Sequence, residues 1–473
     1  MHRRMMKAYP HQLQLLQHII LRCIPCHSRR YGTAVVRDIL KLHKRGVFHH
    51  MMPELRVPDL AKKLSSPQTV YCGFDPTADS LHIGNLLAII TLIHCQRAGH
   101  SPIALVGGAT GKIGDPSGKN TERPRLDDDI IEKNVRGIME NLERIFTNHA
   151  VYLWNDYREL KDVRLLNNIS WYREMNILDF LNNIGRHFRM TTMLKKECVS
   201  SRLSTKEGLS FTEFAYQTFQ AYDWVHLLKT YDCCIQIGGN DQQGNITAGL
   251  ELIEKMLRQD AYGLTIPLVT SSTGQKVGKS EGNAVWLDPR KTTPYELYQY
   301  FYNVADADLS QYMRWFTFLP EEDIDRLLRD HKMEPEKRKP QRLLAEKVLV
   351  LVHGEAGLLE AQRWTEAFFS PSPESLLHLS DSDMQRLFTS APTTDLLLDH
   401  GTTVLDVLIK TKAFDRQVDA DKVVREGGVY INKVRVTDPG AVLVLGEHIL
   451  PNNITLLRIG KKRYHIVRWV TPS

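Results

Sequence analysis

Three polar stretches of the chain carry residue types that bind phosphate groups. The range Tyr71–Asn85 places Thr77 and His82 in a turn between an apolar strand and an apolar helix. Such a turn offers unpaired N–H groups and the positive end of a helix dipole, which together bind anions. A glycine-rich stretch, residues 107–119, follows a second apolar strand. The range Lys276–Ser280 adds two lysines in glycine-rich surroundings, and two ammonium groups there can neutralise phosphate groups.

The elements around these stretches alternate between short apolar strands and helices. The predicted strands are Val70–Gly73, Ile103–Val106, Val151–Trp154 and Ile235–Ile237, and the predicted helices are Leu86–Ala98, Asp128–Phe146 and Phe211–Leu228. This rhythm predicts an α/β fold with a Rossmann-like, doubly wound parallel sheet. Ligands bind such sheets at the carboxyl ends of the strands, where the polar stretches begin. Each stretch alone also fits an ordinary turn or solvated charges, but their joint order and spacing favour one phosphate site.

A second polar set lies within the predicted helix 211–228. Tyr216, Gln220 and Asp223 recur at intervals of four and three residues, which places them on one helical face. An outward polar stripe would have the same spacing, but the apolar residues on the other faces favour an inward position. The polar run 236–245 follows a predicted strand, and its adjacent glycines allow a nucleotide to approach closely.

Composition limits the class of protein. The 473 residues are 42% hydrophobic and 25% charged, as in globular proteins, and the longest apolar runs are far too short for a bilayer, so we expect no membrane partner. The seven scattered cysteines favour free thiols in a reducing compartment. Since no Cys/His cluster has metal-ligand spacing, we expect no structural metal.

The net charge of +6 is concentrated at the N-terminus. Residues 1–37 hold seven basic residues and no acidic one, which leaves 54 basic against 55 acidic residues in the rest of the chain. An arginine-rich, acid-free start with an apolar segment is typical of a mitochondrial presequence, which we predict for residues 1–34. Any RNA-binding surface must therefore come from a local cluster, such as the cations and tyrosines of the last 78 residues, 396–473.

The order of these motifs resembles a known family. The run His-Ile-Gly-Asn at 82–85, followed far downstream by Lys-Val-Gly-Lys-Ser at 276–280, is similar to the paired motifs of class I aminoacyl-tRNA synthetases. Within that class, residues 71–84 with 107–119 resemble tyrosyl-tRNA synthetases of the bacterial or organellar type, and the resemblance runs from about Arg45 to the C-terminus. It implies ATP-dependent activation of L-tyrosine to tyrosyl-adenylate and transfer to the 3′ end of mitochondrial tRNA(Tyr).

The resemblance also implies roles for individual residues. The residues expected in catalysis are Thr77, His82, Lys276 and Lys279. Those expected to bind tyrosine are Tyr71, Asp115, Tyr216, Gln220, Asp223 and Gln242. Those expected to bind ATP are Gly73, Asp75, His82, Gly84, Asn85, Gly239, Asp241, Lys276, Lys279 and Ser280. In this scheme Asp223 and Tyr71 bind the phenolic hydroxyl. Three of the others, Asp115, Tyr216 and Gln220, bind the α-ammonium group.

The same resemblance implies the domains and the partners. We expect a presequence at 1–34, a catalytic domain at 35–290 with a dimerisation insertion at about 178–203, an α-helical anticodon-side domain at 291–369, a linker at 370–395 and a small α+β S4-like RNA-binding domain at 396–473. The expected partners are L-tyrosine, tRNA(Tyr), a second copy of the chain, and ATP as substrate with Mg²⁺ on its phosphates. The expected location is the mitochondrial matrix.

Two positions depart from the family pattern, and two alternatives remain open. Asn85 stands where histidine is usual, and the 276–280 motif lacks the common Met-Ser centre although both lysines remain. A tryptophan-specific class I enzyme is one alternative, but a hydroxyl pocket of Asp223 and Tyr71 disfavours it. An RNA-binding or RNA-splicing factor that lost catalysis is the other. The presence of Thr77, His82 and both lysines disfavours that reading.

Overall fold

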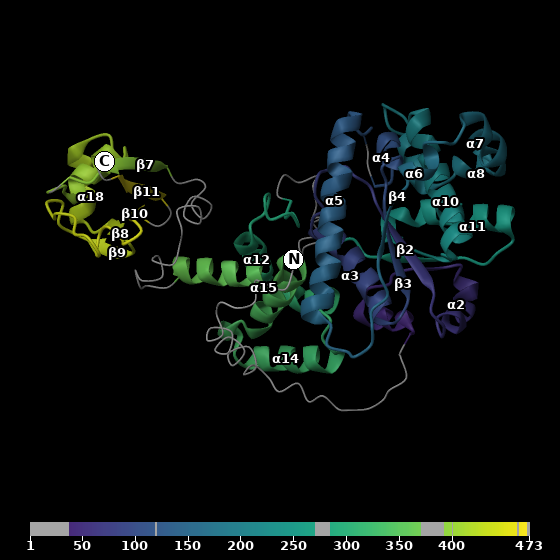
Figure 1. Ribbon diagram of the computed structural model, residues 1–473, viewed down its shortest axis with the longest axis horizontal. Helices are drawn as coiled ribbons and strands as arrows, with labels where there is room; N and C mark the ends of the chain where they lie inside the picture. The colour runs from purple at the N-terminus through teal and green to yellow at the C-terminus, as the bar shows by residue number, and fades with distance from the viewer. Residues whose placement is uncertain are drawn as a thin grey trace, which may run out of the picture. The chain divides into compact units, whose positions relative to one another are not determined.

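The computed structural model describes residues 37–118, 121–269, 284–369, 392–399, 401–460 and 463–470 (Figure 1). The predicted presequence, the 276–280 motif and most of the predicted linker lie outside these ranges. No helix within them is both long and apolar enough to cross a bilayer.

The first part of the chain is organised around one mixed sheet, in the order β1–β6–β5–β2–β3–β4. Its strands are β1 (Met51–Met52), β2 (Thr69–Phe74), β3 (Ser101–Val106), β4 (Arg164–Asn167), β5 (Ile235–Gly239) and β6 (Tyr262–Ile266). Neighbouring strands are parallel except β1, which runs antiparallel to β6. From β2 the chain moves outward through β3 to β4 and then returns to β5 on the other side of β2. The strand order therefore reverses between β2 and β5, where such sheets bind ligands.

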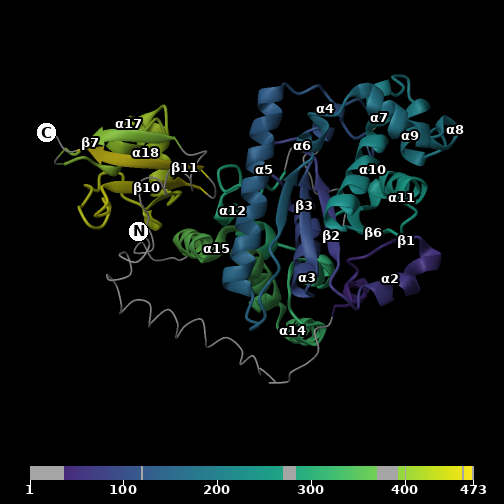
Figure 2. The same ribbon diagram turned by 45° about the vertical axis from the view of Figure 1, so that its right-hand side comes forward.

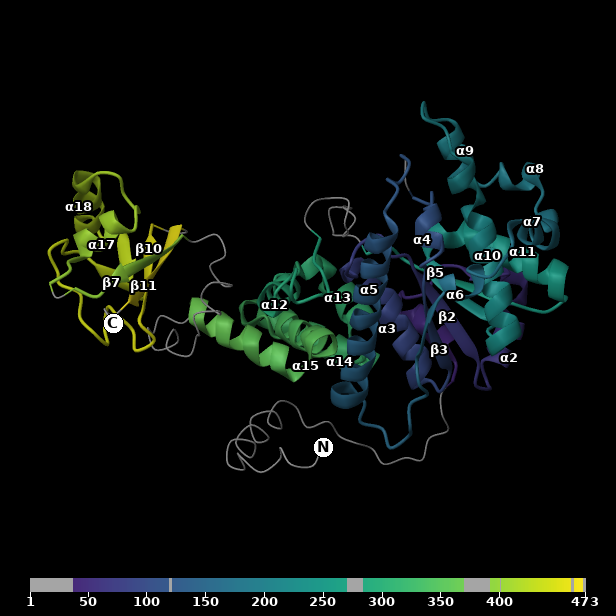
Figure 3. The same ribbon diagram turned by 45° about the horizontal axis from the view of Figure 1, so that its top comes forward.

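Helices cover both faces of this sheet (Figures 1, 2 and 3). Two of them, α3 (Ile83–Arg97) and α5 (Asp128–Asn148), lie on one face, and α10 (Phe211–Tyr231) and α11 (Gln243–Leu257) lie on the other. Right-handed crossovers place helices on opposite faces on the two sides of the reversal. Helix α3 is apolar nearly all round and buried, whereas α5 is amphipathic. The predicted doubly wound α/β fold is confirmed.

One predicted strand is wrong. Residues 149–153 form a π-helical turn (η3, His149–Leu153) that follows α5 directly, and the side chains of Val151 and Tyr152 are exposed. The strand at this edge is instead β4, which pairs in parallel with β3. An edge strand with one apolar pair between polar ends has a weak sequence pattern. The more apolar run just before it therefore misled the prediction.

Short elements connect the sheet and its helices. Before β2 lie η1 (Ile39–Arg45), η2 (Glu54–Arg56) and α2 (Val57–Lys63), and α4 (Thr110–Ile113) follows β3. Between β4 and α10 lie α6 (Ile169–Tyr172), α7 (Ile177–Asn183), η4 (Gly185–His187), α8 (Met190–Met193) and α9 (Glu197–Leu203), and η5 (Asn240–Gln242) follows β5. A buried ion pair, Arg202 to Glu213 at 2.8 Å, joins this insertion to the start of α10.

The chain continues into a helical part that shares the main core. It comprises α12 (Pro294–Tyr302), α13 (Asp306–Phe316), α14 (Glu321–Met333), η7 (Pro335–Lys337) and α15 (Lys339–Phe369). The guanidinium of Arg45 donates to the carbonyl oxygens of Arg314, Thr317 and Leu319, which ties the start of the described chain to the end of α13. Helix α15 breaks at Gly354, whose φ of 71° lies in the left-handed region.

The C-terminal residues form a second sheet with its own core. Its elements are β7 (Thr393–Leu397), α17 (Val404–Lys410), α18 (Gln417–Arg425), β8 (Val429–Ile431), β9 (Val434–Val436), β10 (Ile454–Ile459) and β11 (Arg463–Val470). The strand order is β7–β11–β10–β8–β9, and the hairpin predicted within 427–436 is β8–β9. Strand β7 begins inside the stretch predicted as linker. This part has the predicted α+β composition.

Candidate active site

A cavity of about 400 Å³ opens beside the carboxyl ends of β2 and β5, at the reversal of strand order. Every predicted site residue that the structure describes lines it: Tyr71, Gly73, Asp75, Thr77, His82, Gly84, Asn85, Asp115, Tyr216, Gln220, Asp223, Gly239, Asp241 and Gln242. The other three predicted residues, Lys276, Lys279 and Ser280, lie outside the described residues. Stretches separated by up to 170 positions in the sequence thus meet in one site.

The first motif forms the N-terminal cap of α3. The Nδ1 atom of His82 accepts the Gly84 N–H at 3.0 Å, and the Asn85 side-chain oxygen accepts the His82 N–H at 3.2 Å. Because Nδ1 is an acceptor here, the proton of the neutral imidazole lies on Nε2. The Asn85 side chain thus completes the helix cap, a role that asparagine fills well in place of histidine. The cap aims an imidazole and the positive end of the helix dipole at the cavity. The expectation of unpaired N–H groups is wrong for the first three helical residues: Ile83 donates to the Val285 carbonyl oxygen, and Gly84 and Asn85 donate to acceptors of His82.

One end of the cavity is a buried pocket for a hydroxyl group. Asp223 is only 3% exposed and accepts hydrogen bonds from Trp171 Nε1 at 2.9 Å and Asn168 Nδ2 at 3.0 Å. Burial raises the pKa of Asp223 to about 7, although these two hydrogen bonds favour its charged form. The hydroxyl of Tyr71 is buried in the same cavity and has no hydrogen-bond partner among the described residues. An unpartnered buried hydroxyl beside a carboxylate fits a ligand hydroxyl that bonds to both.

A second cluster contains two carboxylates. Asp75 accepts hydrogen bonds from Tyr216 Oη and Thr110 Oγ1, each at 2.8 Å. Burial and the nearby charge of Asp115 raise the pKa of Asp75 to about 6. The side chain of Asp115 accepts from Gln242 Nε2 at 2.7 Å. Two carboxylates facing one cavity, Asp115 buried and Asp75 half-buried, favour a cationic group between them.

Glycines let the backbone approach this cluster closely. A Cβ added at Gly107 would lie 2.2 Å from Asp75 Oδ1 and 2.3 Å from Thr110 Oγ1. A Cβ at Gly239 would lie 2.5 Å from Asp241 Oδ1. By contrast, a Cβ at Gly73 would meet nothing within 4 Å, which leaves open space above this strand end.

Sequence reasoning missed several residues that line the cavity. They are Thr110, Ser117, Arg123, Asn168 and Gln236. Sequence reasoning also missed Trp171 of α6, which does not line the cavity but donates to Asp223. Gln236 follows from the sheet, since it pairs in register with Tyr71 across β2 and β5. Asn168 and Trp171 follow β4, which the sequence did not reveal. A residue that directly follows a strand can be recognised as a site candidate only when the strand itself is predicted, and β4 was not.

The fold is of the class I synthetase type. A family model described as tRNA synthetases class I (W and Y) matches residues 62–370, and one described as the tyrosine–tRNA ligase SYY-like C-terminal domain matches residues 383–467. The chain is similar to a mitochondrial tyrosine–tRNA ligase of Drosophila melanogaster, 48% identical over 94% of this chain and 96% of that one. It is also similar to the Homo sapiens counterpart, 46% identical over 90% of each. A solved C-terminally truncated mitochondrial tyrosyl-tRNA synthetase of Coccidioides posadasii matches with a TM-score of 0.61 and 30% identity, over 74% of this chain and 96% of that one.

The chain belongs to the tyrosine–tRNA ligase family of class I tRNA synthetases. The family expected from the motifs is therefore confirmed. Relatives that share 41–48% of their residues with it, in animals and in bacteria, carry tyrosine and not tryptophan in their names.

Proposed function

We propose that this chain ligates L-tyrosine to tRNA(Tyr) in two steps. The tyrosine carboxylate attacks the α-phosphorus of ATP, a C–O–P bond forms, and pyrophosphate leaves. A terminal ribose hydroxyl of the tRNA then attacks the carbonyl carbon of tyrosyl-adenylate and expels AMP. Neither step needs a protein nucleophile, so the residues act by orienting the substrates and stabilising charge.

The observation that carries this proposal is the buried hydroxyl of Tyr71 beside Asp223. A phenolic hydroxyl placed between them donates to the Asp223 carboxylate and accepts a hydrogen bond from the Tyr71 hydroxyl. That hydroxyl otherwise has no partner among the described residues. Phenylalanine would leave both groups desolvated and unpaired, so the pocket selects against it. The bond from Trp171 orients the carboxylate toward the ring of the substrate.

The second cluster suits the amino end of the same substrate. We assign the α-ammonium group to Asp115, Tyr216 and Gln220, with Gln242 beside Asp115. Burial and the charge of Asp115 raise the pKa of Asp75. An ammonium group among these residues balances that negative charge and so stabilises the ionised form of Asp75.

The remaining lining residues suit ATP. The start of α3 with His82 and Thr77 faces the phosphates, and the ribose hydroxyls donate to Asp241 beside the close-approach Gly239. We assign to Lys276 and Lys279 the neutralisation of the leaving pyrophosphate, as the family motif implies. ATP enters as its Mg²⁺ complex, because Mg²⁺ is held largely by phosphate oxygens and water in such reactions.

We propose that two copies of the chain form a dimer through the insertion and the start of α10. This region exposes several large apolar side chains: Ile177, Leu178, Leu181, Met190, Leu194, Leu203 and Phe211. A cluster of this kind on one region favours an interface. Sedimentation of Leu178→Asp should show a monomer; an unchanged mass would reject this interface.

The C-terminal part supplies cations next to aromatic rings, which suits tRNA. The Arg458 guanidinium lies 3.9 Å from the Tyr430 ring centroid, and that of Arg463 lies 6.0 Å from the Phe414 ring. The names of the animal relatives and the acid-free start of the sequence favour a mitochondrial location, and we propose the matrix, where a mitochondrial tRNA would be charged.

Pyrophosphate exchange, with tyrosine, phenylalanine and tryptophan offered separately, tests the proposal. We expect exchange with tyrosine alone, followed by charging of tRNA(Tyr). Exchange with tryptophan would reject the pocket assignment. Folded protein that binds tRNA without any exchange would support an RNA-binding factor instead.

A further inference from the structure

The turn that carries His82 is held by a distant segment of the chain. Residues 81–83 and 285–287 lie antiparallel to each other. The Ile83 N–H donates to the carbonyl oxygen of Val285 at 3.0 Å. In the other direction, the Leu287 N–H donates to the carbonyl oxygen of Leu81 at 2.8 Å. The backbone on both sides of His82 is thus fixed by this pairing.

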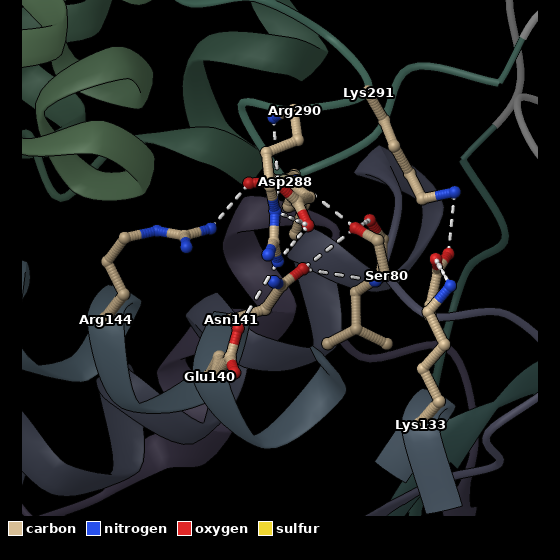
Figure 4. A network of polar contacts seen from close by, with 11 residues as sticks. Ser80, Lys133, Glu140, Asn141, Arg144, Asp288, Arg290 and Lys291 are labelled. Atoms are coloured by element: carbon tan, nitrogen blue, oxygen red, sulfur yellow. Dashed lines mark hydrogen bonds and ion pairs between the residues drawn. The ribbon is translucent and has the colours of Figure 1, made fainter. Parts of the chain in front are cut away.

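Asn141 of α5 holds the same turn from behind (Figure 4). Its side chain is fully buried, and its Oδ1 accepts the Leu81 N–H at 3.2 Å. The Ser80 hydroxyl, whose one proton also faces the Leu81 carbonyl oxygen at 2.8 Å, lies 2.9 Å from the same Oδ1. The Leu81 N–H can only donate, so it fixes the orientation of the Asn141 amide. The Ser80 oxygen in turn accepts the Asp288 N–H at 3.2 Å. One amide oxygen therefore holds the turn, and through Ser80 it also reaches the paired segment.

Arg144, one turn further along α5, holds the paired segment directly. Its Nη2 donates to the Leu287 carbonyl oxygen at 2.6 Å, and its Nε donates to the Val352 carbonyl oxygen at 3.0 Å. Val352 lies just before the break of α15 at Gly354, where carbonyl groups lose their helical partners. The guanidinium therefore satisfies two backbone oxygens from two different segments.

Helix α5 approaches the turn at backbone distance. A Cβ added at Gly137 would lie 2.1 Å from the Asp79 carbonyl oxygen. Gly137, Asn141 and Arg144 follow each other at intervals of four and three residues, so they form one face of α5. A face with a glycine contact, a buried amide and a half-buried guanidinium leaves the turn little freedom to shift.

Figure 4 also shows ion pairs that are more exposed than the contacts of Asn141. Arg290 pairs with Glu140 at 3.3 Å, and Lys291 pairs with Asp79 at 2.6 Å. The side chains of Glu140 and Arg290 are 60% and 71% exposed, and exposed pairs contribute little. Glu140, next to Asn141 in sequence, therefore offers a matched control position on the same helix.

We propose that Asn141 is a positioning residue for tyrosine activation, which sets the place of His82 through Ser80 and Leu81. The inference rests on the role assigned to His82 in the proposed function. Donors that stabilise charge in a transition state act only when they are placed to within a fraction of an ångström. Asn141 lies behind the turn and does not line the cavity, so its loss changes the placement of His82 and leaves the tyrosine pocket intact.

Three variants test this role in the full-length protein: Asn141→Ala, Asn141→Asp and Glu140→Gln. We expect Asn141→Ala to lower kcat of pyrophosphate exchange about 10- to 100-fold, with the tyrosine Kd within about twofold of the wild-type value. Asn141→Asp keeps an oxygen in the acceptor position, so we expect it to regain most of kcat. We expect Glu140→Gln to match the wild type. A purely structural role predicts instead that kcat and tyrosine-binding capacity fall together, in proportion to the folded fraction.

A double-mutant cycle with His82→Ala separates the inference from its premise. If Asn141 acts through His82, then Asn141→Ala costs less than about threefold in kcat when His82 is already absent. Equal losses in both backgrounds would overturn the inference, and so would a wild-type kcat in Asn141→Ala. If His82→Ala alone kept full activity, the result would reject the role proposed for His82, on which the inference about Asn141 rests. Should Asn141→Ala not fold, Ser80→Ala, which removes one bond of the same chain, replaces it in the cycle.

Discussion

The end of the cavity proposed to bind tyrosine and the turn proposed to face the nucleotide are built in different ways. The tyrosine end relies on side chains: Asp223 is fixed by Trp171 and Asn168, and few other groups can replace it. The nucleotide end relies on backbone: a helix cap at His82 is held by strand-like pairing and by the buried amide of Asn141. If the proposed roles hold, specificity depends on single side chains here, whereas phosphate binding depends on a supported segment.

The largest effect is expected in the tyrosine pocket. Asp223→Ala removes the acceptor of the phenolic hydroxyl and leaves the N–H groups of Trp171 and Asn168 unpaired. Losing the charged hydrogen bond to the substrate and leaving the buried phenolic hydroxyl without an acceptor together cost about 4 kcal/mol, so we expect kcat/KM for tyrosine to fall about 10³-fold in pyrophosphate exchange. The KM for ATP should change little. A loss below about tenfold would contradict the pocket.

A smaller effect is expected at the nucleotide end. His82→Ala removes one donor that faces the phosphates, and we expect kcat to fall about 10²-fold while the tyrosine Kd stays near its wild-type value. Pre-steady-state adenylate formation and equilibrium binding of tyrosine measure the two quantities. An increase in the tyrosine Kd as large as the loss in kcat would mean that the two ends are not separate.

Alanine variants of two glycines compare a tightly packed position, Gly107, with an open one, Gly73. In Gly107→Ala the new methyl group would meet Asp75 Oδ1 and Thr110 Oγ1, so we expect a loss of several degrees in Tm and about a tenfold loss of kcat/KM for tyrosine. In Gly73→Ala the methyl group meets nothing within 4 Å, so Tm should not change. Any loss of activity in Gly73→Ala then reports contact with a bound substrate. Thermal melts of both variants decide between these outcomes.

The last prediction concerns stability and its pH dependence rather than activity. The pKa of Asp223 is about 7 in the folded chain and near 3.8 when unfolded, so the folded form binds one proton more between about pH 4 and 7. Stability therefore falls as pH rises through this window, by at most about 1.4 kcal/mol per pH unit. Asp223→Asn removes this contribution. We expect its Tm to exceed the wild-type value at pH 8, with a smaller gain at pH 5. Equal shifts at both pH values would reject the raised pKa.

The parts of the site that sequence could predict are those with local signals. The turn before α3, the spacing of Tyr216 and Asp223 and the glycines before Asp241 all follow from short-range patterns. Trp171 could not be predicted, because it follows an edge strand that the sequence did not reveal. Asn141 could not either, since a polar residue on an amphipathic helix gives no sign that it faces a backbone turn 60 positions away.

The affinity difference between tyrosine and phenylalanine tests the central claim most directly. Isothermal titration of both amino acids into wild-type protein and into Tyr71→Phe isolates the role of the unpartnered hydroxyl. If the pocket is built for a phenolic hydroxyl, the wild type binds tyrosine far more tightly, and Tyr71→Phe narrows the gap by about tenfold through weaker tyrosine binding and stronger phenylalanine binding. An unchanged gap in Tyr71→Phe would contradict the account, because the hydroxyl would then have no part in recognition.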